Sequence, residues 1–428
     1  MPTLFLLVSL FGAALTLNAY RPLARRGSNA VVTFFAGWLV SELPVHHLLW
    51  QASFTLVFAW FGALAAWPGW VALAVNLVSW SVLASMVFDA QRSEAHIDAA
   101  LRAGLGDDYR ARTGDDWRDR DDPHLTLRRI LRPFATAHPL VERIRNVRYA
   151  PHGRRGLLDI VRHKDARKGC PVLIQVHGGA WIIGSKDDQG IPLTNHMAAQ
   201  GWVCVSINYR LSPRGTFPDH IIDVKRAIAW VKENIEQYGG DPLFIAITGG
   251  SAGGHLASLA ALTANAPEYQ PGFEDRDTSV QACVPFYGVY DWTNRAGTGH
   301  EGLLGLLERR VLKVSRQKNP DLYDRGSPMS RVHEDAPPFF VLHGSHDTLV
   351  PVVEAQQFVN LLRGISHAHV AYAELPGAQH AFEVFLSFRT AHAVRGVARF
   401  LSYVYSERNT RVSSTRPLEP RELVAAAK

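Results

Sequence analysis

The sequence predicts an α/β fold, with a doubly wound, mostly parallel sheet of eight strands preceded by a bundle of apolar transmembrane helices. Two observations support this prediction. From about residue 143 onward, short runs rich in Val, Ile and Leu alternate with segments of helical period, which is typical of a parallel sheet covered on both faces. Before residue 89, in contrast, only Arg21, Arg25, Arg26 and Glu42 carry a formal charge.

Three runs in the first region lack a polar face: residues 3–20, 54–67 and 70–88. The first and last approach the roughly 20 residues that cross a hydrocarbon core. Nearby tryptophans resemble those found at membrane interfaces. A further run, 31–50, contains Glu42, Pro44 and two histidines, and is either a fourth span, a re-entrant piece or an interfacial helix. We therefore expect residues 1–90 to form an integral membrane region with three or four spans.

The arginines behind the first apolar run bear on its role and its orientation. A cleavable signal peptide has its basic residues in front of the apolar run, so it explains this segment less well. Arginines next to a span favour the cytoplasmic side for residues 20–29. The remainder of the chain would then lie outside with four spans and inside with three, and both remain open.

Two charged segments flank the predicted α/β domain, which spans residues 143–405. Residues 91–142 are expected to be a linker, in which 125–134 alternates arginine with apolar residues and either rests on anionic lipid or forms a solvated helix. Residues 406–428 are rich in Pro, Ser, Thr and charge, and we expect a disordered tail.

Composition argues against several classes of protein. The three cysteines, Cys170, Cys204 and Cys283, lie in apolar runs without the spacing of a metal site, so buried free thiols are expected. The chain has no ribonucleoprotein motif, zinc-finger spacing or basic tract, which argues against nucleic-acid binding. We expect neither a metal nor an organic cofactor.

The α/β domain is expected to contain eight strands and at least four helices. The strands are predicted at residues 144–149, 157–163, 171–176, 203–208, 243–248, 280–286, 339–343 and 369–374. The helices are predicted within residues 217–240, 251–264, 353–364 and 391–405.

A nucleophile is predicted where the strand at 243–248 meets the following helix. Residues 249–253 read Gly-Gly-Ser-Ala-Gly, the G-x-S-x-G pattern, with Ser251 at its centre. A serine on such a tight turn has strained backbone angles and needs small neighbours, and the helix dipole points at its hydroxyl. The strand before the motif and the helix after it make Ser251 a candidate catalytic nucleophile.

A serine hydroxyl needs a base, and the base needs a partner that orients it. Asp347 follows the next-to-last strand and His380 follows the last strand, in the order Ser, Asp, His that G-x-S-x-G enzymes use. Asp291 is kept as an alternative acid. We expect the neighbouring histidines His343 and His346 to be structural or to line the site, and His255 to pack against the sheet.

The glycines after the strand at 171–176 answer a second chemical need. Attack on an ester carbonyl creates an oxyanion, which requires backbone N–H donors already in place. We expect Gly178 and Gly179 to supply two of them, because a residue without a side chain allows close approach, and the N–H of Ala252 to complete the pocket.

Taken together, residues 143–405 resemble the α/β-hydrolase superfamily and, within it, the carboxylesterases of the hormone-sensitive lipase family. The resemblance rests on HGGAW (177–181), NYRLSP (208–213), GGSAGG (249–254), the Asp347 loop and GAQHAF (377–382). The positions that support these motifs are His177, Trp181, Gly249 and Gly253. The membrane-anchored, mycobacterial Lip-type esterases are similar in combining an apolar leader with a hydrolase.

The chain departs from the family pattern at three positions. Gly250 stands where the family usually has Asp or Glu, Ala180 stands where it has a third oxyanion glycine, and Arg214 replaces an acid. These departures leave two related groups open, the kynurenine-formamidase-like amidases and the prenylcysteine-methylesterase-like hydrolases.

The resemblance implies a membrane-anchored serine carboxylesterase or lipase that works through an acyl-enzyme. A lipid-partitioned, amphiphilic ester is the expected substrate. The amphipathic stretch within residues 293–317 is either a lid or acyl-binding wall, or a set of plain surface helices. A non-catalytic scaffold on the same fold is the remaining alternative, and the oligomeric state is left open.

Overall fold

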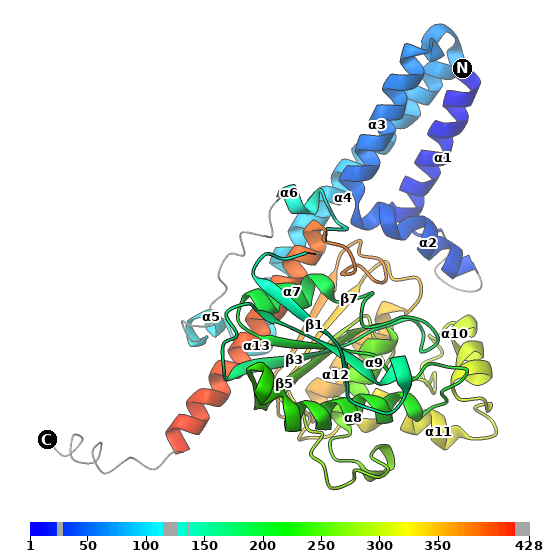
Figure 1. Ribbon diagram of the computed structural model, residues 1–428. Coiled ribbons are helices and arrows are strands. Elements are labelled where there is room, and N and C mark those ends of the chain that lie inside the picture. The colour runs from blue at the N-terminus through cyan, green and yellow to red at the C-terminus, as the bar shows by residue number, and fades with distance from the viewer. Residues whose placement is uncertain (24–28, 114–126, 136, 416–428) are drawn as a thin grey trace, which may run out of the picture.

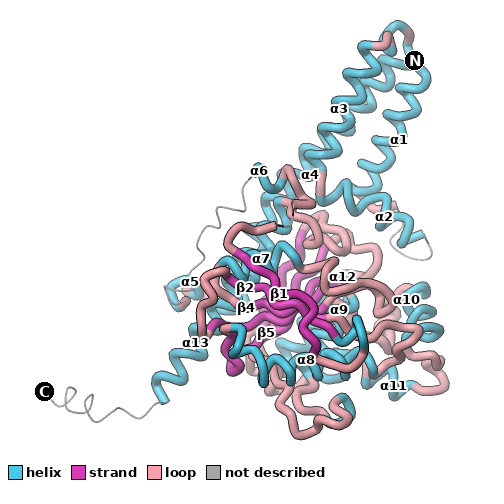
Figure 2. The backbone as a smooth tube through the Cα atoms, viewed as in Figure 1, coloured by secondary structure: helices cyan, strands magenta, loops and turns pink. Residues whose placement is uncertain are grey.

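A computed structural model of the protein describes residues 1–23, 29–113, 127–135 and 137–415. Eight strands form one central sheet with helices on both sides (Figures 1 and 2). The strands are β1 (Val141–Arg148), β2 (Leu157–His163), β3 (Cys170–Val176), β4 (Val203–Ile207), β5 (Gly240–Gly250), β6 (Ala282–Phe286), β7 (Phe339–Gly344) and β8 (Val370–Leu375). All eight predicted strands are therefore confirmed.

The sheet has the order β1-β2-β4-β3-β5-β6-β7-β8. In this order β1 pairs antiparallel with β2, and β2 pairs antiparallel with β4. Every further pair, from β4 through β3 to β8, is parallel. Successive residues of a strand point to opposite faces, so Val172 and Ile174 join one core while Leu173 joins the other. Because both faces are buried, the parallel strands read as continuous apolar runs.

The helices divide between the two faces. α8 (Asp219–Asn234), α9 (Ala252–Leu262) and α12 (Val352–Ile365) contribute to one core. α7 (Ile191–Ala199) and α13 (Phe388–Thr415) contribute to the other. Four helices are shorter: α5 (Tyr109–Arg112), α6 (Leu127–Ile130), α10 (Glu301–Leu306) and α11 (Pro320–Arg325). All three cysteines are buried and free, as expected.

The N-terminal region consists of α1 (Pro2–Tyr20), α2 (Asn29–Glu42), α3 (Pro44–Trp60) and α4 (Trp67–Leu105). α1, α3 and the first half of α4 pack together and project from the α/β domain (Figure 1). Of the described helices, α1 and α4 are long and apolar enough to cross a membrane. The predicted run 31–50 is divided between α2 and α3, because Pro44 begins a new helix at a position where its missing N–H costs nothing.

Two predicted boundaries differ in the structure. α4 continues without a break through residue 90, and its second half packs on the α/β domain, where Gly104 lies directly against Ala371. α13 extends to Thr415, so residues 406–415 are helical rather than disordered. Glu407 explains part of this extension, because it accepts a hydrogen bond of 2.9 Å from Tyr403 and contacts His369 Nε2 at 3.2 Å. Residues 416–428 and 114–126 lie outside the described residues.

Candidate active site

Ser251 lies between the end of β5 and the start of α9, as predicted. Its backbone has φ +57° and ψ −122°, a conformation that a residue with a side chain rarely adopts. The turn leaves no space for side chains at the neighbouring glycines. A Cβ added at Gly253 would lie 2.1 Å from the Val176 carbonyl oxygen, and one added at Gly249 would lie 2.6 Å from the backbone of Gly253. The glycines of the motif are therefore required by close backbone packing.

Asp347 and His380 lie in the loops after β7 and β8, and they contact each other. His380 Nδ1 lies 2.7 Å from Asp347 Oδ2. The other carboxylate oxygen accepts hydrogen bonds of 2.8 Å from the amides of Leu349 and Val350. Burial opposes the charged form of Asp347, but the charges and hydrogen bonds of His380 and His343 outweigh it and hold the pKa of Asp347 well below its usual value.

His343 is a second partner of the same carboxylate. Its Nε2 lies 3.2 Å from Asp347 Oδ2 and 3.0 Å from the Val350 carbonyl oxygen. Burial lowers the pKa of His343, but the hydrogen bond to Asp347 and the carboxylate charge raise it more. The alternative acid, Asp291, instead pairs with Arg295 at 3.2 Å. The structure thus brings Asp347, and not Asp291, to the imidazole of His380.

Ser251, His380 and Gly179 line one cavity of about 550 Å³. Its polar end holds these residues together with Ala180 and Tyr287. The remaining lining is mainly apolar and comes from several parts of the chain: Leu303 and Leu306 of α10, Val289, Leu349, Val384, and five residues of α2. The amphipathic stretch predicted within 293–317 therefore does contribute a wall to this cavity.

The structure corrects the role expected for Gly178. Its N–H already donates a hydrogen bond of 2.7 Å to the side-chain oxygen of Gln189. A Cβ at this position would lie 2.6 Å from the Gly250 carbonyl oxygen and 3.2 Å from Ser251 Cβ. Gly178 is therefore needed for close approach to the serine turn, and it is not a free donor. Sequence reasoning missed this because Gln189 reaches the glycine only through tertiary packing.

Three other amides belong to residues that line the cavity or adjoin Ser251. Gly179 and Ala180 line it with φ values of +110° and +52°. Ala252 is the first residue of α9, next to Ser251. Among the described residues, none of these three amides donates a hydrogen bond to protein. They are available to stabilise a negative charge that develops beside the serine oxygen.

His177 and Trp181 flank the loop of Gly178, Gly179 and Ala180, and both side chains make hydrogen bonds. Burial lowers the pKa of His177 to about 4, so the ring is neutral, and Nδ1 donates to the Gly178 carbonyl at 2.7 Å. The ring also stacks on Tyr209 at 4.3 Å. Trp181 Nε1 donates to His255 Nδ1 at 3.2 Å, which confirms the expected packing role of His255.

Gly250, where the family usually carries an acid, faces a tyrosine. A Cβ at Gly250 would lie 2.5 Å from the Tyr287 hydroxyl oxygen. That hydroxyl donates to the buried carboxyl of Glu383, and the Tyr287 ring lies 4.5 Å from the His380 ring. Burial raises the pKa of Glu383 to about 7. A buried acid, Glu383, is thus linked to this turn through Tyr287. Its position three residues after His380 is the only signal of this role in the sequence.

Comparison with known proteins shows the family to which the chain belongs. A family model described as BD-FAE matches residues 158–362. The probable carboxylic ester hydrolase LipM of Mycobacterium tuberculosis is 46% identical over 417 residues, covering 94% of this chain and 93% of LipM. Esterase LipQ of the same organism is 44% identical over 390 residues, covering 90% of this chain and 87% of LipQ. The chain belongs to the Lip-type family of carboxylic ester hydrolases.

As a Lip-type protein, the chain is a carboxylic ester hydrolase. Its α/β-hydrolase fold also appears in a solved structure described as a truncated form of a carbohydrate esterase from gut microbiota, with a TM-score of 0.52 and 24% identity, covering 62% of this chain and 99% of that one. That likeness concerns the fold alone. A rice protein named probable isoprenylcysteine alpha-carbonyl methylesterase ICMEL1 is 31% identical over 225 residues, 49% of the Lip-type chain and 50% of its own.

Proposed function

We propose that this protein is a membrane-anchored serine carboxylesterase that uses Ser251, His380 and Asp347. One observation carries the proposal. The imidazole that contacts the buried carboxylate of Asp347 at 2.7 Å and the hydroxyl of the strained serine turn border the same cavity. That cavity is mostly apolar with a polar end, which is the form expected of a site for an ester with an acyl chain.

The proposed reaction proceeds through an acyl-enzyme. His380 Nε2 takes the proton of Ser251 Oγ as that oxygen attacks the ester carbonyl carbon. Asp347 accepts the Nδ1–H of His380 throughout, which leaves Nε2 unprotonated at the start and stabilises the imidazolium afterwards. His380 then gives the proton to the leaving alkoxide. Water, activated by the same nitrogen, hydrolyses the acyl-enzyme.

We assign the oxyanion contacts to the amides of Gly179, Ala180 and Ala252. Gly179 and Ala180 line the same cavity as Ser251, Ala252 follows Ser251 in the chain, and none of the three amides is engaged with other described residues. Each donor of this kind typically contributes about 10² to 10³ in kcat. Ala180 can replace the family's third glycine because only its N–H is used, and its φ of +52° lies in the small left-handed region that is sterically allowed to L-residues.

The test compares wild type with Ser251→Ala on p-nitrophenyl butyrate, an aryl formamide and a prenylcysteine methyl ester. We expect the wild type to cleave the esters and the variant to lose at least about 10³ in kcat. Preference for the prenylated ester would support the methylesterase alternative, which the rice relative and the apolar cavity favour. Selective cleavage of the formamide would support an amidase. Full activity in Ser251→Ala would refute the proposed nucleophile.

Membrane anchoring is the second part of the proposal. α1 and α4 have the length and composition of membrane spans, and α3 lies against both of them (Figure 1). Many large apolar side chains on these helices are exposed, including Leu7, Phe11, Leu56 and Val78. A bilayer would cover them. The test is fractionation of cells that express the full chain: the protein should stay in the membrane after alkaline carbonate washing, and release by carbonate would contradict an integral anchor.

A further inference from the structure

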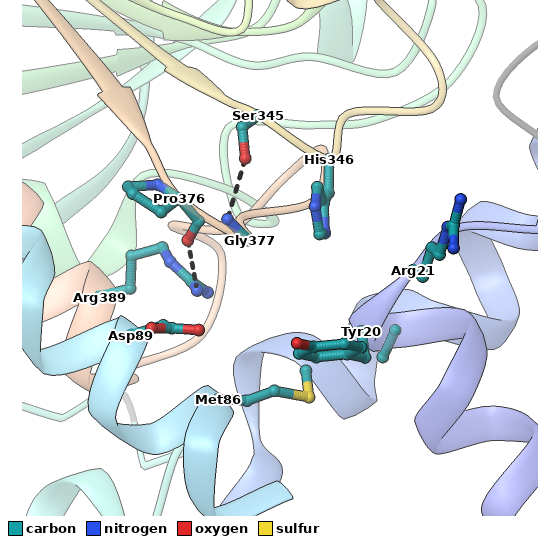
Figure 3. A pocket seen from close by; sticks show the side chains of 10 residues that line it. Tyr20, Arg21, Met86, Asp89, Ser345, His346, Pro376, Gly377 and Arg389 are labelled. Atoms are coloured by element: carbon teal, nitrogen blue, oxygen red, sulfur yellow. Dashed lines mark hydrogen bonds between the residues drawn. The ribbon is translucent and has the colours of Figure 1, made fainter. Parts of the chain in front are cut away.

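The helix α2 connects two apolar helices but is seated on the α/β domain. It follows α1, whose last residue is Tyr20, and it precedes α3, which begins at Pro44 (Figure 1). If α1 and α4 cross the bilayer as proposed, with α3 packed against both, the helix between α1 and α3 lies at the level of the lipid headgroups. Charged residues mark this level. Arg21 and Asp89 border a second cavity of about 380 Å³ between the apolar helices and the loops near His346 (Figure 3).

Polar contacts hold α2 to the loops that carry the proposed catalytic residues. At its start, the Ala30 carbonyl accepts a hydrogen bond of 3.2 Å from Thr348, next to Asp347. In the middle, Trp38 Nε1 donates to the Ala381 carbonyl, next to His380, at 2.9 Å. The position of α2 is therefore coupled directly to the site.

The end of α2 is held by a buried ion pair. Glu42 lies 2.5 Å from Arg389 at the start of α13, and both side chains are almost fully buried. At its start, middle and end, therefore, α2 contacts the α/β domain.

One face of α2 forms a wall of the active-site cavity. The lining residues are Ala30, Val31, Phe34, Phe35 and Trp38. Their spacing follows a single face of a helix. The Phe34 ring stands edge-on to the His380 ring, with centroids 6.0 Å apart. An acyl chain attached to Ser251 would run along this face, because the wall beside the imidazole is apolar.

The opening of the cavity is also apolar. Val31, Phe35 and Ile183 line the cavity and are yet 49%, 66% and 68% exposed. Val32 and Leu39, which are not among the lining residues, are also exposed on α2. Exposed apolar side chains around the opening of a cavity mark a surface that is normally covered, and at the headgroup level the covering is lipid.

We infer that α2 is an interfacial wall of the active site, and that the cavity receives the acyl chain of a membrane-resident ester directly from the bilayer. This inference rests on the proposed function and on the proposed anchoring, and it adds the route and the chemical class of the substrate. Val31 and Phe35 are then residues that determine acyl-chain specificity, and α2 is the site of entry.

The first test uses the full-length protein in phosphatidylcholine vesicles and compares two tryptophan substitutions. Val31→Trp places a large side chain in the cavity, whereas Val32→Trp places it on the exposed surface one residue away. We expect Val31→Trp to lower kcat/KM for a vesicle-embedded oleoyl ester at least about tenfold more than it lowers kcat/KM for soluble p-nitrophenyl acetate. Val32→Trp should leave both values within about threefold of wild type.

The outcomes separate this inference from the proposed function. Loss of acetate hydrolysis in Ser251→Ala, with Val31→Trp and Val32→Trp equal on the oleoyl ester, would overturn the inference and leave the esterase mechanism intact. Acetate hydrolysis that does not depend on Ser251 would instead remove the mechanism itself.

The second test does not depend on activity. A bimane label on Val32→Cys should be quenched by brominated phosphatidylcholine in the same vesicles. The matched label on Leu243→Cys, an equally exposed position at the start of β5, should not be quenched. Equal quenching of the two labels, or none at Val32→Cys, would refute contact of α2 with lipid.

Discussion

Replacing Asp347 by asparagine tests the orientation of the proposed base. The carboxylate accepts two amide hydrogen bonds on Oδ1, both 2.8 Å long, and contacts His380 through Oδ2. An asparagine can satisfy the amides of Leu349 and Val350 only with its carbonyl oxygen. The opposite orientation would lose both bonds, at about 1 kcal/mol each, and would place donors against donors.

The asparagine Nδ2–H₂ must then face His380 Nδ1. The imidazole would accept that hydrogen bond on Nδ1 and carry its own proton on Nε2, where it cannot take a proton from Ser251. We expect kcat to fall about 10⁴-fold, the usual loss when this tautomer is imposed on a triad. That loss corresponds to about 5 kcal/mol of transition-state stabilisation.

The assay is steady-state hydrolysis of p-nitrophenyl butyrate by detergent-solubilised protein, with circular dichroism to verify folding. Asp291→Asn is the matched control, because it makes the same change in a buried carboxylate that pairs with Arg295. Its kcat should stay within about threefold of wild type. A folded Asp347→Asn variant that keeps more than about a tenth of wild-type kcat would refute the reasoning, and so would an equal loss in both variants.

Three further predictions follow from the surroundings of the site. Gly250→Ala should lower kcat at least about tenfold, measured on the same ester, because its Cβ would lie 2.5 Å from the Tyr287 hydroxyl; wild-type activity would contradict this. Glu383→Gln should match the wild-type free energy of unfolding at about pH 5 and exceed it at about pH 8, measured by chemical denaturation. Folding raises the pKa of Glu383 from 4.5 to about 7, so the neutral acid stabilises the fold and this contribution is lost as pH rises through that range. Parallel pH profiles of the two proteins would contradict this prediction. Glu42→Gln should lower the free energy of unfolding by roughly 3 to 5 kcal/mol, because it leaves the charge of Arg389 buried without an ion-pair partner. An unchanged thermal unfolding temperature would count against a structural role for the pair.

Local sequence patterns were sufficient for much of the fold. The strands follow from runs of strand length, and the parallel ones read as continuous apolar runs because both faces of that part of the sheet are buried. Ser251 could be predicted for a similar reason: the strained turn, its glycines and the following helix are all contiguous in the chain. The pairing of Asp347 with His380 required only that each follow a neighbouring strand.

Helix boundaries were less predictable from composition. The change from apolar to charged residues at 89 suggested an end of the membrane region, but nothing there stops a helix, and α4 continues to Leu105. Composition indicates whether a segment lies in water or in an apolar environment, whereas the end of a helix depends on capping residues and on residues that break the helix. Contacts of Glu407 similarly hold the helix beyond residue 406, although its composition suggested disorder.

The sequence by itself determined the sheet, the serine turn and the order of the proposed triad, because each depends on neighbours along the chain or on the ends of adjacent strands. Only the tertiary structure decided the rest. The Gly178 amide donates to Gln189, Glu383 accepts a hydrogen bond from the tyrosine that faces Gly250, and α2 forms one wall of the cavity. These contacts join segments whose distance in space is set by packing of the whole domain, and residue order carries no local signal for them.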